Sequence, residues 1–261
     1  IYSRIAKILG HRPPEQYVYE LFLDDKGEKI SKSKGNGISV EEWLAYAPDE
    51  SLSLFQFQKP RVAKKLYFDV IPKTVDEYLT FLEKYPDEEP ARQLENPVWH
   101  IHSGNPPKAD VPVSFALLLN LVAVANPDDK SQLWGFISRY APEASAETHP
   151  LLDSLAGYAM RYYRDFVLPA KVFRAPSEQE RAAMADLSAR LKAFDEEPTP
   201  ENLQTLTFSI GNEHGFENLR EWFKALYEVL LGQEQGPRFG SFAALYGVGN
   251  TARLIDEALA R

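Results

Sequence analysis

The segment GEKISKSKGNG, residues 27–37, combines side chains and backbone that could bind a polyphosphate. It contains three lysines interleaved with two serines: Lys29, Ser31, Lys32, Ser33 and Lys34. Lysines attract phosphate oxygens as point charges, serine hydroxyls add hydrogen bonds, and the glycines that follow leave the backbone free to move. Such a loop could close over a group whose charge shifts during a reaction. Composition alone favours a simpler interpretation, a solvated lysine-rich loop.

The elements that must position this loop have an α/β pattern. Apolar residues at 1, 5, 8 and 9 predict a helix that ends at Gly10. The segment 17–23, YVYELFL, is typical of a strand, and Asp-Asp-Lys-Gly then predicts a turn. Residues 28–30 would form a short return strand that leads into the loop.

Beyond Gly37 the pattern is helical. Ser39 with Glu42, and Thr74 with Glu77, have the spacing of capping boxes, and Pro48 suits a first helical position. Periodicity predicts further helices at 113–125, 128–140, 150–168, 178–194, 200–213, 217–231 and 250–260. The polar, proline-bearing stretch 86–97 marks a domain boundary. The predicted fold is mainly α, with a small α/β portion at its start.

Composition limits the functions that the chain can have. The 261 residues carry a formal charge of −9, which argues against a general nucleic-acid coat but permits local basic patches. There is no cysteine, so disulfides, zinc thiolate sites and thiol catalysis are excluded, and a reducing, cytoplasmic location is expected. No apolar run reaches membrane-spanning length and no signal peptide is evident, so no membrane partner is expected.

The order of residues in the loop is more specific than its composition. KISKSKGN resembles the Lys-Met-Ser-Lys-Ser signature of class I aminoacyl-tRNA synthetases, with Ile30 in the methionine position. The resemblance implies that the loop closes over ATP triphosphate, with magnesium, while the amino-acid carboxylate displaces pyrophosphate. Lys29 and Lys32 would be the catalytic lysines, and Lys32 the principal phosphate contact. The ATP-binding residues would be Ser31, Lys32, Ser33 and Lys34.

Longer segments narrow the resemblance to the class I type of lysyl-tRNA synthetase. They are the region 13–72, NPVWHIHSGNPP at 96–107, IGNEHGF at 210–216 and residues 218–248. This resemblance implies three parts: the end of a catalytic domain at 1–37, stem-contact helices at 38–95, and an α-helical anticodon-binding domain at 96–261. The implied partner is tRNA(Lys).

The chain also departs from that family. Class I synthetases carry a His-x-Gly-His signature far ahead of the lysine–serine loop, but only 28 residues precede Lys29 and none form it. HIHSG at 100–104 has the wrong order and follows the loop. We therefore expect a carboxyl-terminal portion that needs an amino-terminal catalytic domain of the same protein and does not activate lysine alone.

Three clusters are candidate tRNA contacts. Lys64 and Lys65, with Arg61 on one helical face, would meet phosphates, although a solvated face is the simpler interpretation. The other candidates are Arg161 and Arg164, among aromatic residues, and Arg238 with Phe239 in a glycine-rich segment. Basic and aromatic side chains suit unstacked anticodon bases, but aromatics at helical spacing often form the core.

Two other functions remain open at this point. A helical protein-interaction module that retains the loop as an inherited surface would agree with the acidic charge. An independent phosphotransferase using Lys32 is disfavoured, since no carboxylate pair suited to magnesium stands near the loop. His100 and His102 could share a metal, but no third ligand lies near them, so no metal site is predicted.

Overall fold

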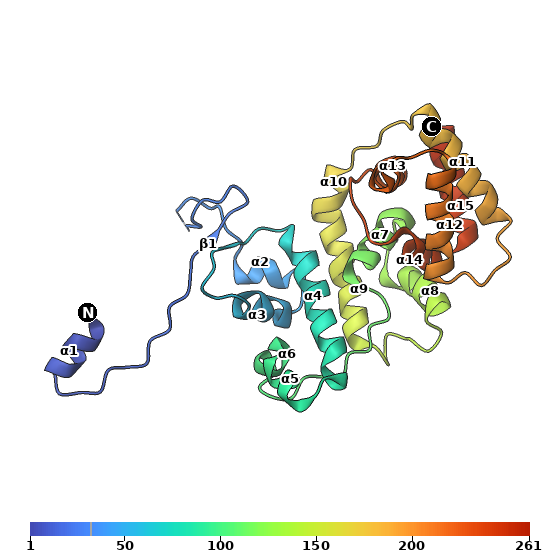
Figure 1. The fold of residues 1–261 in the computed structure, drawn as a ribbon. Coiled ribbons are helices and arrows are strands. Elements are labelled where there is room, and N and C mark those ends of the chain that lie inside the picture. The colour runs from blue at the N-terminus through green and yellow to red at the C-terminus, as the bar shows by residue number, and fades with distance from the viewer. Residues whose placement is uncertain (32) are drawn as a thin grey trace.

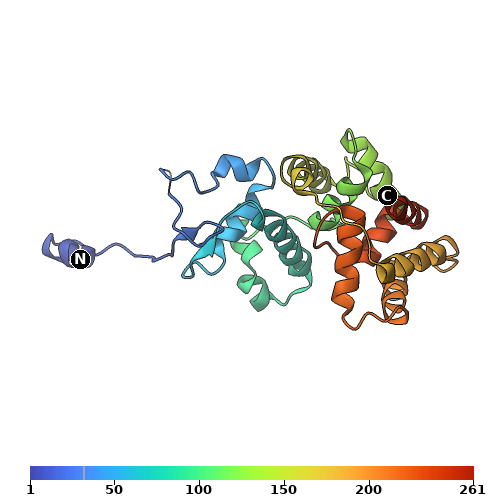
Figure 2. The ribbon, with the colours of Figure 1, turned by 90° about the horizontal axis from the view of Figure 1, so that it is seen from above.

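The computed structural model describes residues 1–31 and 33–261, and its architecture is mainly helical. Figure 1 shows helix α1 at the end of an extended segment, followed by a first group of helices and then a larger helical group that holds the carboxyl terminus. Viewed from above, the two groups lie side by side along one axis (Figure 2). The predicted fold class, mainly α with a small α/β portion, is confirmed.

The first part of the chain contains the only two strands found in the described residues. Its elements are α1 (Tyr2–Ile8), β1 (Phe22–Leu23), α2 (Val40–Leu44), α3 (Asp49–Phe57), β2 (Lys64–Lys65), α4 (Val70–Lys84), the 3₁₀ turn η1 (Tyr85–Asp87), α5 (Pro90–Glu95) and α6 (Pro97–Ile101). Strands β1 and β2 pair in parallel, with Phe22 opposite Lys64. The predicted strand at 17–23 is therefore much shorter, because residues 17–21 have no ladder beside them.

The larger helical group begins at Phe115. It comprises α7 (Phe115–Ala125), α8 (Lys130–Tyr140), α9 (Pro150–Tyr162), the π-helical segment η2 (Tyr163–Val167), α10 (Leu168–Ala170), α11 (Glu178–Lys192), α12 (Pro200–Glu213), α13 (Leu219–Leu231), α14 (Phe239–Tyr246) and α15 (Val248–Ala260). Most of these agree closely with the helices predicted from periodicity. The sequence interpretation missed α5, α6 and α14.

Local capping explains several helix starts. The hydroxyls of Ser39 and Ser177 each accept a hydrogen bond from the backbone N–H three residues on, and the carboxylate of the glutamate there, Glu42 or Glu180, accepts the backbone N–H of the serine. The capping box predicted at Thr74 is wrong. Thr74 lies inside α4 and donates its hydroxyl to the carbonyl of Val70 at 2.8 Å, because the apolar stripe of this helix already begins upstream of Thr74.

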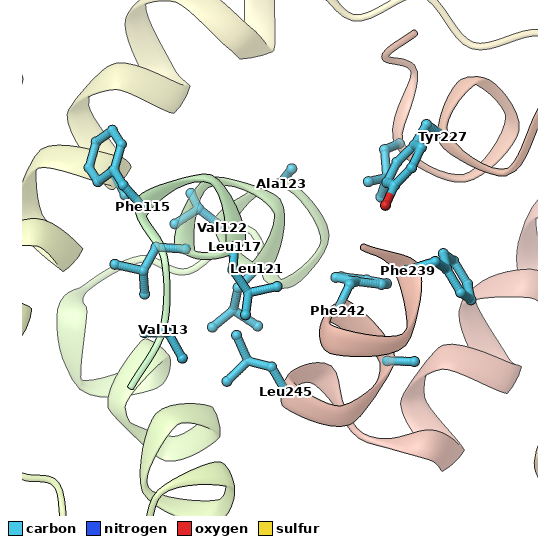
Figure 3. Close-up of a cluster of buried hydrophobic side chains, with 14 of the residues drawn as sticks. Val113, Phe115, Leu117, Leu121, Val122, Ala123, Tyr227, Phe239, Phe242 and Leu245 are labelled. Atoms are coloured by element: carbon cyan, nitrogen blue, oxygen red, sulfur yellow. The ribbon is translucent and has the colours of Figure 1, made fainter. Parts of the chain in front are cut away.

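The core of the larger group is built around α7, which is apolar on most of its surface. Its side chains meet α9 on one side and α14 and α13 on the other. In Figure 3, Leu121 and Leu117 of α7 point toward Phe242 and Leu245 of α14, while Tyr227 of α13 closes the cluster from above. A helix apolar on nearly all sides is stable in water only when neighbouring helices surround it.

The two groups of helices are joined by polar and aromatic contacts. The carboxylate of Asp76 on α4 accepts the backbone N–H groups of Phe115 and Ala116, the first residues of α7. Tyr46 stacks edge-on against Phe166 at 4.9 Å and donates its hydroxyl to Asp165 at 3.1 Å. Both Asp165 and Phe166 lie in η2, so the π-helical segment forms part of this junction.

Gly240 allows α14 to approach the start of α12. A Cβ at this position would lie 2.2 Å from the carbonyl oxygen of Pro200 and 2.5 Å from the backbone nitrogen of Gln204. We expect Gly240→Ala to lower the free energy of unfolding by about 1–3 kcal/mol, because backbone atoms cannot move aside cheaply. Urea unfolding would measure this loss.

Gly249 provides the matched control. It lies in α15, where a Cβ would meet no atom within 4 Å, so Gly249→Ala should be neutral or stabilising by up to about 1 kcal/mol. Equal destabilisation by the two substitutions would show that helix packing at Gly240 is not the cause.

Candidate functional site

The lysine–serine loop is carried by a tight hairpin. After β1, Asp24 begins a turn in which its backbone N–H donates to the carbonyl of Glu28 at 2.8 Å, and Gly27 adopts a φ of +84°. Lys29 then forms an antiparallel bridge with Leu23. The short return strand predicted at 28–30 is thus reduced to this bridge, with Ile30 N–H donating to the Phe22 carbonyl. The hairpin leaves the side chain of Lys29 exposed.

The buried carboxylate of Asp24, which the sequence interpretation missed, accepts hydrogen bonds from both ends of the loop. Asp24 is only 6% exposed and accepts backbone N–H groups from Lys26 at 3.0 Å and Glu28 at 2.7 Å. Its other oxygen accepts the side-chain amide of Asn36 at 2.7 Å. The hydrogen bond from Asn36, opposed by desolvation and aided by the two backbone donors, lowers the pKa of Asp24. The available signal was the Asp that opens the turn together with the Asn of Gly-Asn-Gly.

Of the predicted ATP-binding residues that the structure describes, Ser33 and Lys34 are exposed and Ser31 is half-buried. The hydroxyls of Ser31 and Ser33 lie 2.8 Å apart. Lys34 forms a 3.0 Å ion pair with Glu28, which raises the pKa of Lys34, and both side chains are about 60% exposed. Lys32, the predicted principal phosphate contact, lies outside the described residues. The structure therefore brings the hydroxyls of Ser31 and Ser33 together and pairs Lys34 with Glu28, the neighbour of Lys29.

Lys64 has a different environment from the one expected. The helical face predicted for Lys64 and Lys65 is wrong, because both residues form β2. The ammonium of Lys64 donates to carbonyls at the end of α3, including Gln58 at 2.7 Å, and lies 4.9 Å from the centre of the Phe55 ring. Burial lowers the pKa of Lys64. Lys65 is exposed and donates to the Asp25 carbonyl at 2.8 Å, which ties β2 to the hairpin.

Arg161 and Arg164 line one cavity of about 670 Å³ on the larger helical group. The guanidinium of Arg161 lies 5.4 Å from the centre of the Tyr158 ring, and Arg164 pairs with Asp165 at 2.9 Å. Lys130, which the sequence interpretation missed, lines the same cavity and is paired with Asp153. The cavity thus presents three cations, two of them already matched by carboxylates.

Arg238 and Phe239, the third predicted tRNA contact, lie in different environments: one is exposed and the other is buried. Phe239 is 2% exposed and packs against Phe242, with ring centres 5.9 Å apart. This burial disfavours the stacking role predicted for Phe239, because a packed ring is not available to a base. Arg238 is exposed at the start of α14 and does not line the cavity of Arg161 and Arg164.

Comparisons with known proteins show which proteins the chain resembles. A family model described as tRNA synthetases class I (K) matches residues 1–105. The lysine–tRNA ligase of Roseobacter denitrificans is 57% identical over 260 residues, which cover 100% of this chain and 49% of the relative. Those of Rickettsia bellii and Rickettsia felis are 54% and 52% identical, each over 99% of this chain and 50% of the relative.

The chain therefore matches a portion of a class I lysyl-tRNA synthetase. It spans about half the length of the curated relatives it matches. The hairpin at 22–37 lies within the residues that the synthetase family model matches, whereas the cavity of Arg161 and Arg164 lies beyond them. Identity to the synthetase relatives nevertheless extends over both regions.

His100 and His102, the two candidate metal ligands, are in contact with other groups of this chain. The ring of His100 lies 2.9 Å from the carbonyl of Leu94, and that of His102 lies 3.1 Å from the Tyr78 hydroxyl. Within residues 1–31 and 33–261, no group of three potential metal ligands is found. Nor does any helix of that described part have the length and apolar character needed to cross a bilayer.

Proposed function

We propose that this chain is the tRNA-binding portion of a lysine–tRNA ligase, which forms lysyl-adenylate from ATP and lysine and transfers lysine to tRNA(Lys). The observation that carries the proposal is the exposed hairpin that presents Lys29, Ser31 and Ser33 in the order of the synthetase signature. Full-length relatives named lysine–tRNA ligase match the whole of this chain.

In this proposal the lysine–serine loop stabilises the charge that develops on the triphosphate as pyrophosphate leaves. Lys29 and Lys32 supply positive charge, and Ser31, Ser33 and Lys34 supply further hydrogen-bond donors. Magnesium accompanies ATP as part of the substrate and neutralises phosphate charge. These roles follow from the family resemblance of the loop, and the exposure of Lys29 and Ser33 supports them.

The amino-terminal catalytic domain of the same protein is the proposed partner of the first residues. Helix α1 buries none of its residues, and a run of large apolar side chains nearby is exposed: Ile1, Tyr2, Ile5, Ile8, Leu9, Tyr17, Val18, Tyr19 and Leu21. A concentration of exposed large apolar side chains of this kind is typical of a segment that contacts another domain. Without that domain and its His-x-Gly-His signature, the chain should not activate lysine. We further propose a cytoplasmic location, because the chain has no cysteine and so needs no oxidising compartment.

The helices are proposed to divide the contacts with tRNA(Lys). Residues 1–37 complete the catalytic domain, 38–95 contact the stem and 96–261 form the anticodon-binding domain. Helix α6 packs against α3 and α4, which gives the second and third parts a shared boundary. The cavity of Lys130, Arg161 and Arg164 supports an RNA contact on the third part, because these cations neighbour the ring of Tyr158.

The rival function is a helical protein-interaction module without aminoacylation activity. The pairing of Arg174 with both Glu180 at 2.7 Å and Glu228 at 2.6 Å favours it, since this arginine, which follows the aromatic residues around Arg161 and Arg164, is already neutralised by carboxylates. Such a module would bind no tRNA. Binding of the chain to tRNA(Lys), and to the same tRNA with a changed middle anticodon base, separates the two functions. Loss of binding on the base change supports anticodon recognition, whereas no binding to either RNA supports the rival.

Arg161 and Arg164 provide a sharper test of the same proposal. We expect the double substitution Arg161→Ala/Arg164→Ala to weaken tRNA binding and to reduce the slope of log K against log salt by about 1–2, since each phosphate contact contributes somewhat less than one. Filter binding at several salt concentrations measures both quantities.

A control with the same charge change is Arg139→Ala/Arg220→Ala. Both arginines are exposed and neither lines the cavity. If the two double variants lose the same affinity and slope, the cavity is not the contact and only the overall charge matters.

A further inference from the structure

Asp24 is the most completely hydrogen-bonded carboxylate near the lysine–serine loop, yet none of its bonds goes to a cation. Its three donors are two backbone N–H groups of its own turn and the Asn36 amide, twelve residues away. A buried carboxylate that loses such a donor is left with unsatisfied acceptor capacity, which is costly. The bond from Asn36 therefore fastens the end of the loop to its start.

Asn36 uses the rest of its side chain on the loop backbone itself. Its Oδ1 accepts the N–H of Ser31 at 3.0 Å, and its Nδ2 lies 3.3 Å from the carbonyl oxygen of Lys29. The side-chain amide of Asn36 therefore holds the backbone at both Lys29 and Ser31, the first and third residues of the signature. The side chain of Lys29 points outward and is exposed, so this hold leaves the proposed phosphate-binding group free.

The glycines on either side of Asn36 allow the backbone to bring the Asn36 side chain to Asp24, Lys29 and Ser31. Gly35 has a φ of +63°, in the left-handed region that suits glycine. At Gly37 a Cβ would lie 2.2 Å from Cγ2 of Ile30, so the chain returns in direct contact with the signature. The Gly-Asn-Gly sequence therefore lets the loop close onto Asp24.

We propose that Asp24 and Asn36 are positioning residues of the ligase: together they fix the backbone at Lys29 and Ser31, so that the phosphate-binding side chains are arranged before ATP is bound. This inference rests on the proposed function. Electrostatic catalysis depends on donors that are already oriented when charge develops, and small misplacements of such groups are expensive. Asp24 and Asn36 act through Lys29, Ser31 and Ser33, and neither touches substrate.

The test uses the full-length protein with its amino-terminal half. Asn36→Asp retains the size of the side chain but removes the donor and places a second carboxylate against Asp24. We expect the kcat of lysine-dependent ATP–pyrophosphate exchange to fall at least about tenfold, as the loss of a hydrogen bond to a buried charge implies, with the KM for lysine unchanged. Asn218→Asp is the control, since it makes the same charge change at the cap of α13, where aspartate also caps well.

The double variant Asp24→Asn/Asn36→Asp, in which the two residue types are swapped, distinguishes a loss of loop positioning from a general loss of structure. It can retain an N–H···O bond between the two side chains and the bond to Ser31, but it places a carboxylate oxygen in place of the amide N–H that faces the Lys29 carbonyl. We expect it to recover part of the lost kcat. Hydrogen–deuterium exchange of the peptide 26–37 should be faster in Asn36→Asp and return toward the wild-type rate in the double variant.

The outcomes are distinct. An active wild-type protein whose Asn36→Asp variant matches Asn218→Asp overturns the positioning role, as does faster hydrogen exchange without any loss of kcat. If the wild-type full-length protein shows no lysine-dependent exchange, the ligase proposal is wrong. In that case, equal hydrogen–deuterium exchange of the peptide 26–37 in the wild type and in Asn36→Asp would also show that the bond between Asp24 and Asn36 does not fix the loop.

Discussion

Replacing either Lys29 or Lys32 with alanine in the full-length protein is expected to slow lysine-dependent ATP–pyrophosphate exchange by about 10²–10³-fold. This is the typical loss when one preorganised group that stabilises developing charge is removed. Lys29 stands exposed at the return of the hairpin, and its backbone is held by the Asn36 amide. In the proposed role, its ammonium lowers the barrier while the triphosphate gains charge, so kcat should fall more than the affinity for ATP.

Lys26→Ala is the matched control for this prediction. Lys26 is an exposed lysine of the same hairpin, and the bond that it contributes to Asp24 comes from its backbone, which alanine retains. Steady-state exchange kinetics with ATP varied would give kcat and KM for each variant. Equal activity of the Lys29, Lys32 and Lys26 variants would remove the phosphate-binding role of the loop.

Replacing Trp222 with alanine is expected to lower the free energy of unfolding by about 3–5 kcal/mol, which is the range for removing a buried aromatic side chain. Trp222 is fully buried on α13, and its indole N–H donates to the carbonyl of Thr207 at 3.0 Å. Gly211 of α12 makes room for the ring, since a Cβ there would lie 2.7 Å from Trp222. The substitution would leave a cavity between α12 and α13 that their backbones cannot easily fill.

The neighbouring Phe223 gives the comparison. It is only half-buried and packs edge-on against Phe208, which is 40% exposed. Phe223→Ala should therefore cost less than about 2 kcal/mol. Urea unfolding of both variants would show the difference, and similar losses would mean that the cavity left by Trp222 collapses.

Much of the fold could be predicted because its signals are local. The serine–glutamate pairs at Ser39 and Ser177 fix helix starts through atoms three residues apart, and the long apolar period of 150–168 needs no distant partner to be recognised. The lysine–serine loop was recognisable for the same reason. Its signature consists of side-chain types in a fixed order, which folding does not alter.

Features that depend on distant contacts were missed or misplaced. Helix α14 has only eight residues and contains Gly240, and it is stabilised by close packing on α12, which no local pattern reports. The strand at 17–23 reduced to two residues because a strand is defined by its partner, and β2 supplies only two. Lys64 was expected on a helix, but the fold uses its ammonium to bind the carbonyls at the end of α3.

The sequence by itself determined the family resemblance, the mainly helical class and the order of lysines and serines in the loop. Tertiary structure alone decided which side chains can act. It buried Phe239, brought Lys130 to Arg161 and Arg164, and joined Asp24 to Asn36. The physical reason is that exposure and hydrogen-bond partners are set by the packing of segments far apart in the chain, whereas residue order and helical period are properties of each segment alone.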